Sequence, residues 1–461
     1  MPVMAVMMPG MGFSMGPGMK GGAVGGVAAA KAEEKVEKTL FDVEGRCSES
    51  FIKMHIAKLP CSVKQEHKGE KAKEATMSKK GEVVCVTGGS GCIGSWLVRL
   101  LLDRGYTVHA TVKNLKDEKE TKHLESLEGA NTRLRLYQID LLDYDSIVTA
   151  INGCAGVFHL ASPCIVDQVH DPQNELLDPA IKGTINVLTA AKENGVRRVV
   201  VTSSISSIIP SPNWPADVIK NEDCWTDVEY CKQNSLWYPL SKTLAEKAAW
   251  EFSKEKGLDV VVVNPGTVMG PVISPVLNAS MVMLVRLLQG CTETYEDFFM
   301  GTAHFKDVAL AHIIVYENPS ATGRHLCVEA ISHYGDFVAK VAELYPEYQI
   351  PRNLIVCCPQ ISFETMCHAQ KSTFPMCVEA LKLSRLPMDT QPGLLRTKNG
   401  AKKLMDLGLE FIPMEQIIKD AVESLKSEGL SVTVLLCGQF EQRRGGLLSG
   451  AKNAGGAVLG K

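Results

Sequence analysis

The sequence predicts an α/β fold, a doubly wound parallel sheet flanked by helices, with a smaller C-terminal substrate lobe. Continuous Val-rich runs, such as Val199-Val200-Val201 and Val260-Val261-Val262-Val263, are typical of strands buried on both faces of a parallel sheet. Segments with helical spacing, such as 180–193 and 241–256, lie between these runs. Alternation of buried strands and helices predicts a doubly wound sheet.

The first strand–helix–strand unit carries a glycine-rich turn. Residues 83–86 form a short apolar run, 93–102 have helical spacing, and 106–112 are again strand-like. The turn at 87–94 joins the first strand to the helix and has the form Gly-x-x-Gly-x-x-Gly. In this context such a turn predicts a dinucleotide-binding Rossmann unit, and the alternative is a purely structural glycine turn.

The three glycines of this turn have separate expected roles. Gly88 allows the tight turn, Gly91 lets the main chain approach a pyrophosphate, and Gly94 lets the helix pack closely on the strand. Cys92 and Ile93 begin the helix, whose N-terminal N–H groups would face the phosphates.

The end of the second strand predicts NADP (NADPH) rather than NAD. An NAD enzyme normally has Asp or Glu there, bonded to the ribose 2′-hydroxyl. This chain has Val112-Lys113-Asn114, with Lys116 close by. We expect no carboxylate to repel a 2′-phosphate and expect Lys113 to bind it. The alternative is that Lys113 is a solvated surface charge.

The ends of the later strands supply the other expected cofactor contacts. Asp140 follows the third strand and could meet the adenine amino group, or it could cap the next helix. Ala161 and Ser162 follow the fourth strand, where the chain would pass the nicotinamide ribose. Pro265, at the end of the last Val-rich run, is assigned to the same site.

A Tyr/Lys pair predicts acid–base chemistry. Tyr238 and Lys242 are four residues apart and share one helix face, if the helix begins close enough to Tyr238 to tolerate Pro239. A nearby ammonium should lower the tyrosine pKa from ~10, so that the phenol can protonate a carbonyl oxygen while hydride reaches its carbon. Lys242 would also hold ribose hydroxyls, and Ser204 would polarise the substrate oxygen. The alternative is a surface Tyr and Lys on an amphipathic helix.

Composition divides the chain into an extension, two functional parts and a tail. Residues 1–80 are of low complexity and predicted to be disordered. We expect an NADP-binding domain with the catalytic residues at 81–264 and a substrate lobe at 265–429. Within the lobe, 353–384 reads as an insertion, because it has no clear period and its flanks would join smoothly without it. Residues 430–461 are Gly-rich and expected to be flexible.

Charge and cysteine usage exclude several function classes. A net charge of −3 gives no reason to expect nucleic acid or an anionic membrane as partner. No run reaches the ~18 apolar residues of a membrane span. The 15 cysteines show no paired spacing for a metal site, and reduced thiols in the cytoplasm are expected. The expected assembly is a monomer or dimer.

Four stretches together resemble the extended short-chain dehydrogenase/reductases, in particular the plant cinnamoyl-CoA reductase and dihydroflavonol reductase group. The matching stretches are Val86–Trp96, Phe158–Pro163, Lys182–Leu188 and Ser241–Trp250. The resemblance implies Ser204, Tyr238 and Lys242 as the catalytic set, with Asn186 as a fourth, structural member. It also implies NADPH-dependent reduction of an aldehyde, a ketone or a hydroxycinnamoyl-CoA-type thioester, in phenylpropanoid-like metabolism, with a phenolic carbonyl compound as substrate.

Two departures keep other functions open. The segment Leu236–Lys242 is unlike that of authentic cinnamoyl-CoA reductases, which favours carbonyl reduction over thioester reduction. A catalytically impaired NADP-binding protein and an epimerase or dehydratase of the same fold remain alternatives. Residues 1–43 resemble the hinge of L7/L12-type ribosomal stalk proteins, so a ribosome-associated protein is a remote alternative.

Overall fold

The computed structural model describes residues 81–165, 169–214, 219–290, 294–295, 298–351, 353–354 and 400–427. The predictions for 1–80 and 430–461 lie outside these residues, as does nearly all of the predicted insertion.

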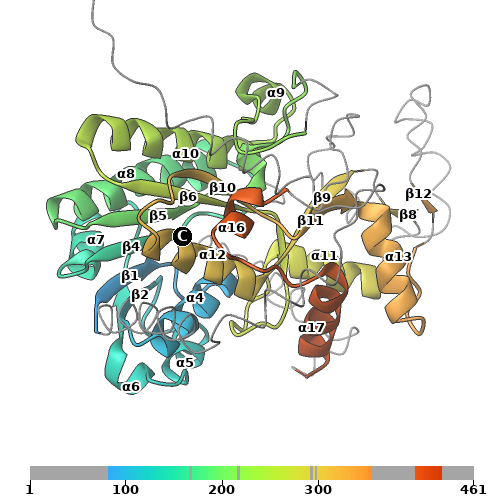
Figure 1. Cartoon of the computed structure of the whole chain (residues 1–461), viewed down its shortest axis with the longest axis horizontal. Helices are drawn as coiled ribbons and strands as arrows, with labels where there is room; N and C mark the ends of the chain where they lie inside the picture. The colour runs from blue at the N-terminus through green and yellow to red at the C-terminus, as the bar shows by residue number, and fades with distance from the viewer. Residues whose placement is uncertain are drawn as a thin grey trace, which may run out of the picture. The chain divides into compact units, whose positions relative to one another are not determined.

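The main sheet has seven parallel strands in the order β10-β6-β5-β4-β1-β2-β3 (Figure 1). The order reverses between β1 and β4, so it is the expected doubly wound sheet, with a cofactor crevice expected at the carboxyl ends of these two strands. The strands are β1 (Val83–Thr87), β2 (Thr107–Val112), β3 (Leu134–Gln138), β4 (Gly156–His159), β5 (Arg198–Thr202), β6 (Val260–Pro265) and β10 (Gly323–Cys327).

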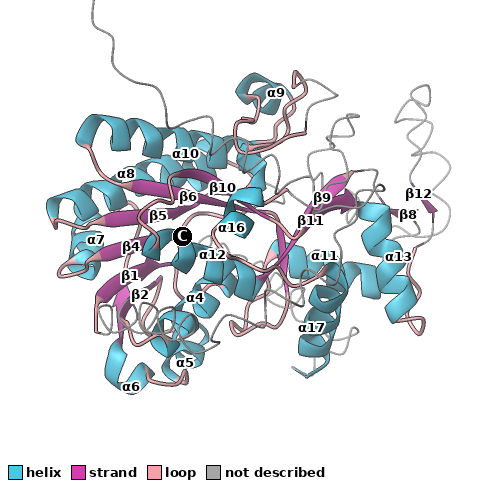
Figure 2. Cartoon of the chain, in the orientation of Figure 1, coloured by secondary structure: helices cyan, strands magenta, loops and turns pink. Residues whose placement is uncertain are grey.

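Helices cover both faces of this sheet, as Figure 2 shows. Alternate strand residues point to opposite faces, so Val84 and Val86 enter one apolar core while Cys85 enters another. The helices of the first core include α4 (Cys92–Asp103), α5 (Glu118–Glu125), α6 (Ala130–Arg133) and α12 (Phe305–Glu317). Those of the second are α7 (Tyr144–Ile151), α8 (Asp178–Glu193) and α10 (Trp237–Lys256). Both cores explain why the central strands are almost purely apolar.

Short elements connect or flank these layers. They are the π-helical turn η1 (Gln173–Leu177), the 3₁₀ turn η2 (Ile205–Ser207), α9 (Val228–Gln233) and α16 (Lys402–Asp406). The turn η2 is separated from the end of β5 by two residues and contacts β6, and α16 contacts β10, so both lie beside the last strands of the sheet.

A second group of elements forms the smaller lobe. Its central sheet has the order β11-β9-β7, and β8 pairs with β12 in a separate two-stranded sheet. The strands are β7 (Thr267–Met269), β8 (Thr294–Tyr295), β9 (Phe299–His304), β11 (Ala330–His333) and β12 (Asn353–Leu354). The helices are α11 (Ala279–Leu288), α13 (Tyr334–Leu344) and α17 (Met414–Ser427), which contact these strands.

The predicted boundary at 264/265 needs correction, because the chain returns to the main sheet after it. Strand β10 pairs in parallel with β6 as the seventh strand, and α12 packs on α4. The sequence of β10, Gly-Arg-His-Leu-Cys, lacks the Val-rich signature of the other strands because it lies at the edge of the sheet.

Candidate active site

The glycine-rich turn has the geometry expected of a phosphate cradle. Gly88 has φ +68°, and a Cβ there would lie 3.0 Å from the Ala161 nitrogen. A Cβ at Gly94 would lie 2.2 Å from the Gly88 carbonyl oxygen, so only glycine lets the helix approach the turn. Gly91 is the N-cap of α4, and no side chain caps this helix start. The main-chain N–H groups of Cys92 and Ile93 therefore begin an uncapped helix, which suits an anionic ligand.

A buried threonine joins the ends of β1 and β4, and the sequence did not reveal it. Thr87 Oγ1 accepts from the nitrogens of Leu160 and Ala161, each at 3.0 Å, and lies 2.9 Å from His159 Nδ1. Burial lowers the pKa of His159 to about 3, so the ring is neutral. Thr87 can then donate to Nδ1 while Nε2 donates to Thr184 Oγ1 at 3.2 Å. This chain of bonds holds the segment predicted to pass the nicotinamide ribose.

The end of β2 differs from expectation in one important respect. Lys113 is exposed there, as predicted for a phosphate contact. However, Glu120 Oε2, from the first turn of α5, accepts from the Lys113 nitrogen at 2.6 Å and the Asn114 nitrogen at 3.3 Å. The expectation that no carboxylate stands at this corner is therefore wrong. The sequence did not show this carboxylate because Glu120 lies seven residues after Lys113, in the helix that follows β2.

The remaining predicted cofactor residues lie at the carboxyl ends of strands. Asp140 is exposed beyond β3 and accepts from the Leu142 nitrogen at 2.8 Å, while Asp143 caps α7 instead. Ser162 follows Ala161 beyond β4. Pro265 is the buried last residue of β6.

Asn186, expected as a fourth, structural member of the catalytic set, lies on α8 and contacts the segment beyond β3. Its Nδ2 donates to the Leu141 carbonyl oxygen at 2.9 Å.

Helix α10 and the turn after β5 bring the three predicted catalytic residues together. Ser204 is buried at the N-cap of η2, and its hydroxyl is hydrogen-bonded to that of Tyr238. The Lys242 Nζ lies 5.8 Å from the centre of the Tyr238 ring. Pro239 is the third residue of α10, where its missing N–H removes no helical bond, so the predicted helix start is confirmed.

The electrostatics of the pair differ from the expected ones. Burial raises the pKa of Tyr238 well above its usual value, Cys164 adds to the rise, and the bond from Ser204 opposes it. Burial also lowers the pKa of Lys242, against smaller effects of Cys164 and Glu246. We expected Lys242 to dominate and lower the tyrosine pKa; desolvation instead has the largest effect and raises it. Tyr238 is therefore a protonated phenol at neutral pH, the form that can give a proton to a substrate.

Cys164, two residues after Ser162, is a member of the site that sequence reasoning missed. Its side chain is exposed and hydrogen-bonds to Tyr238. The thiol thus contacts Tyr238 from the segment beyond β4. The only available signal was its position after the same strand end as Ala161 and Ser162.

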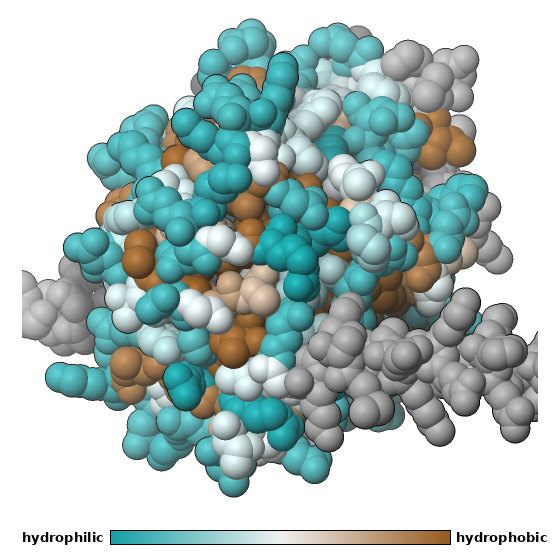
Figure 3. Space-filling model, turned by 60° about the vertical axis from the view of Figure 1, so that its left-hand side comes forward, coloured by the Kyte–Doolittle hydropathy of each residue, from teal (hydrophilic) through white to brown (hydrophobic). Residues whose placement is uncertain are grey.

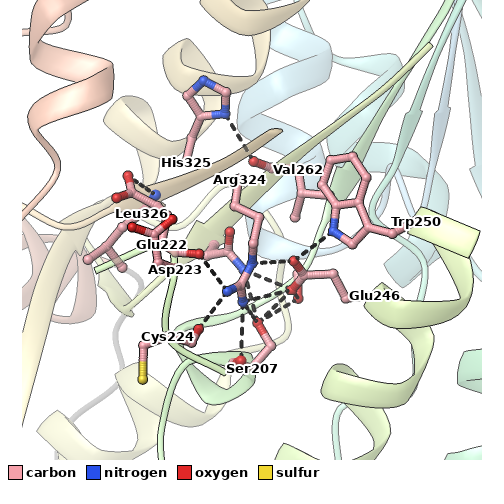
Figure 4. A network of polar contacts seen from close by, with 12 residues as sticks. Ser207, Glu222, Asp223, Cys224, Glu246, Trp250, Val262, Arg324, His325 and Leu326 are labelled. Carbon is pink, nitrogen blue, oxygen red and sulfur yellow. Dashed lines mark hydrogen bonds and ion pairs between the residues drawn. The ribbon is translucent and has the colours of Figure 1, made fainter. Parts of the chain in front are cut away.

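A buried ion pair joins α10 to β10 (Figure 4). Arg324, on β10, donates from Nε to Glu246 Oε1 at 2.6 Å, and both side chains are almost fully buried. The guanidinium also lies 3.9 Å from the centre of the Trp225 ring. Its other N–H groups donate to main-chain carbonyls, those of Ser207, Glu222 and Cys224. Every charged group here has a partner, as burial demands.

The Glu246 carboxylate also holds the segment that carries Ser204. Ser203 Oγ and Ser207 Oγ each lie 2.6 Å from Glu246 Oε2. Ser207 Oγ lies 2.8 Å from the Ser204 carbonyl oxygen, and Asn264 donates to the same carboxylate at 3.0 Å. Because Glu246 is one helical turn after Lys242, one helix positions the lysine and, through this network, the serine.

Comparison with known proteins decides the family. The model of the family described as "NAD dependent epimerase/dehydratase family" matches residues 84–328, more than half of the chain. The chain belongs to this family. The match runs from the second residue of β1 to the residue after β10, so it includes all seven strands of the main sheet.

Plant reductases are among its curated relatives. Cinnamoyl-CoA reductase 1 of Petunia hybrida is 43% identical over 76% of this chain and 94% of its own length. Cinnamoyl-CoA reductase CAD2 of Medicago truncatula is 44% identical over 76% and 98%. Tetraketide alpha-pyrone reductase 1 of Arabidopsis thaliana is 39% identical over 77% and 98%. The predicted resemblance to plant reductases of this group is thereby confirmed.

Solved structures agree. Vestitone reductase from alfalfa has a TM-score of 0.57 and 30% identity, covering 75% of this chain and 99% of that one. The yeast methylglyoxal/isovaleraldehyde reductase Gre2, solved with NADPH, has a TM-score of 0.59 and 25% identity over 75% and 99%. The predicted fold class is confirmed.

The described residues contain neither a membrane-spanning helix nor a cluster of metal ligands. Among the described residues, no helix is long and apolar enough to cross a bilayer, and no group of acidic, His or Cys side chains could hold a metal ion. On the face drawn in Figure 3, hydrophobic residues emerge among hydrophilic ones. The large exposed hydrophobic side chains of the described part are dispersed along the sequence: Leu115, Leu142, Ile219, Val276 and Met405.

Proposed function

We propose that this chain reduces the carbonyl group of a phenolic small molecule with NADPH. The chain is an oxidoreductase of the reductase type. The observation that carries the proposal is the hydrogen-bonded pair Ser204–Tyr238 with the buried Lys242 beside it. Ser204 follows the carboxyl end of β5, and the glycine-rich turn follows the carboxyl end of β1 in the same parallel sheet.

The residues at the turn fit a dinucleotide. A side chain at Gly94 would collide with the turn, the start of α4 is uncapped, and Lys113 stands exposed at the end of β2. The turn would hold the pyrophosphate, Lys113 the 2′-phosphate, and Lys242 the nicotinamide ribose. When bound, NADPH supplies the hydride that reduces the carbonyl carbon.

The three catalytic residues have distinct tasks. Tyr238 gives its proton to the carbonyl oxygen, for which its raised pKa keeps the phenol protonated. Ser204 donates a hydrogen bond to the same oxygen and stabilises the charge that develops there. The Lys242 ammonium favours the phenolate left on Tyr238, so proton transfer costs less than it would in an uncharged pocket.

The substrate class rests on the relatives' names and on chemistry. Their names include cinnamoyl-CoA, tetraketide alpha-pyrone and vestitone, which contain thioester or ketone carbonyl groups beside unsaturated or aromatic systems. We infer an aromatic or conjugated carbonyl substrate, a ketone or aldehyde before a thioester because of the divergent Leu236–Lys242 segment.

A substrate panel tests this proposal. The purified full chain is incubated with NADPH and hydroxycinnamoyl thioesters, flavonoid ketones or aromatic aldehydes, and the loss of NADPH absorbance is followed. We expect turnover with at least one class. Binding of NADPH without turnover of any would instead support an impaired NADP-binding protein, and isomerised or dehydrated product without net NADPH loss would support epimerase or dehydratase chemistry.

Lys113→Glu tests the phosphate contact. The change places a second carboxylate at the end of β2, where it would repel the 2′-phosphate of NADPH but not the 2′-hydroxyl of NADH. We expect NADPH affinity to fall far more than NADH affinity, measured by fluorescence titration. Equal losses for the two nucleotides would remove Lys113 from the phosphate site.

The predicted cytoplasmic location and the monomeric or dimeric state belong to the same proposal. The seven described cysteines form no disulfide bonds with one another, which is expected in a reducing compartment. A fluorescent fusion in cells and light scattering on the purified chain test the two statements separately.

A further inference from the structure

Glu120 lies at the end of β2, where a Rossmann domain distinguishes NADP from NAD by the group at the ribose 2′ position. Its Oε2 accepts hydrogen bonds from two consecutive main-chain N–H groups, those of Lys113 and Asn114. These donors lie directly beyond β2, the place where a Rossmann domain reads the ribose 2′ position. A carboxylate there bonds a 2′-hydroxyl and repels a 2′-phosphate.

Helix α5 positions Glu120 at the end of β2. Three residues later on the same helix face, His123 Nε2 lies 3.1 Å from Ser95 Oγ, in the helix that follows the glycine-rich turn. Asp117 caps the start of α5 by accepting from the Lys119 nitrogen at 2.9 Å. The helix is thus fixed at both its start and its inner face, which keeps Glu120 against the end of β2.

The site therefore contains opposing signals. Lys113 is available for a 2′-phosphate, whereas Glu120 takes two N–H donors that such a phosphate would use and adds a negative charge beside them. We propose that Glu120 is a cofactor-specificity residue that weakens the preference of this chain for NADPH over NADH. This rests on the proposed function only in that the chain binds NADPH.

Binding measurements on the full chain test the proposal without turnover. Four probes are titrated by calorimetry: NADPH, NADH, 2′,5′-ADP and 5′-AMP. Glu120→Gln removes the charge but keeps an acceptor, and Glu120→Ala removes both. We expect each variant to bind NADPH and 2′,5′-ADP about tenfold more tightly, the scale of one charge-assisted contact, with Ala at least equal to Gln. Affinity for NADH and 5′-AMP should stay level or fall.

Glu118→Gln is the matched control. It removes the same charge from the same helix, but the Glu118 side chain is exposed and pairs with Lys122, one turn further along α5, at 2.6 Å. We expect unchanged affinities for all four probes. Unaltered NADPH-to-NADH ratios in both Glu120 variants would overturn the proposal, as would an equal shift in the Glu118 variant. A chain that binds neither nucleotide would instead refute the proposed function.

Discussion

Tyr238→Phe is expected to lower the turnover number at least about 100-fold, the usual scale of general acid–base catalysis. The variant keeps the ring and its packing but removes the only proton that Tyr238 can give. NADPH affinity should remain nearly unchanged, because the phenol is assigned to the substrate oxygen. Single-turnover kinetics and fluorescence titration of the cofactor measure the two quantities separately.

Lys242→Ala should behave differently from the tyrosine variant. It removes both the ammonium beside the ring and the group assigned to the ribose hydroxyls, so turnover and NADPH affinity should both fall. Tyr144→Phe is the control for the tyrosine variant, because Tyr144 bonds Glu193 on the exposed side of α7 and α8.

Wild-type turnover in the Tyr238 variant would exclude Tyr238 as the acid.

The proximity of Tyr238 and Lys242 could be predicted from the sequence because it depends on local spacing alone. Tyr238 and Lys242 share a helix face through the i, i+4 rule alone, and Gly94 follows from the contact of one helix with its own turn. Strand–helix alternation likewise predicts a doubly wound sheet. These are short-range rules, which a single sequence displays directly.

Contacts across the fold could not be predicted in the same way. Arg324 meets Glu246 78 residues away in the chain, and nothing near it marks the edge strand β10 as the seventh of the sheet. Glu120 is only seven residues from Lys113, yet its approach depends on how α5 packs on α4. The direction of the Tyr238 pKa shift was also mispredicted, because burial is a property of the assembled fold. Glu246 had a usable signal, since it follows Lys242 by one helical turn.

The second large effect is expected on stability, for Arg324→Met. Methionine approximates the length of the arginine stem but leaves the Glu246 carboxylate buried without its cationic partner. Breaking a buried pair by removing one partner costs about 3–5 kcal/mol. The carbonyls of Glu222 and Cys224 lose their donors too. Urea unfolding should therefore show a lower midpoint, and turnover should fall because the segment that holds Ser204 loses part of its support.

Combining Arg324→Met with Glu246→Gln separates charge from packing. The neutral amide needs no cation, so the double variant should recover a substantial part of the stability lost by the single one. Lys402→Met is the matched surface control: it breaks the exposed Lys402–Asp406 pair, with both side chains more than half exposed, and should leave the midpoint almost unchanged. If the double variant is no more stable than Arg324→Met, the loss comes from packing around Trp225 and the main-chain bonds, and the buried charge of Glu246 is not its cause.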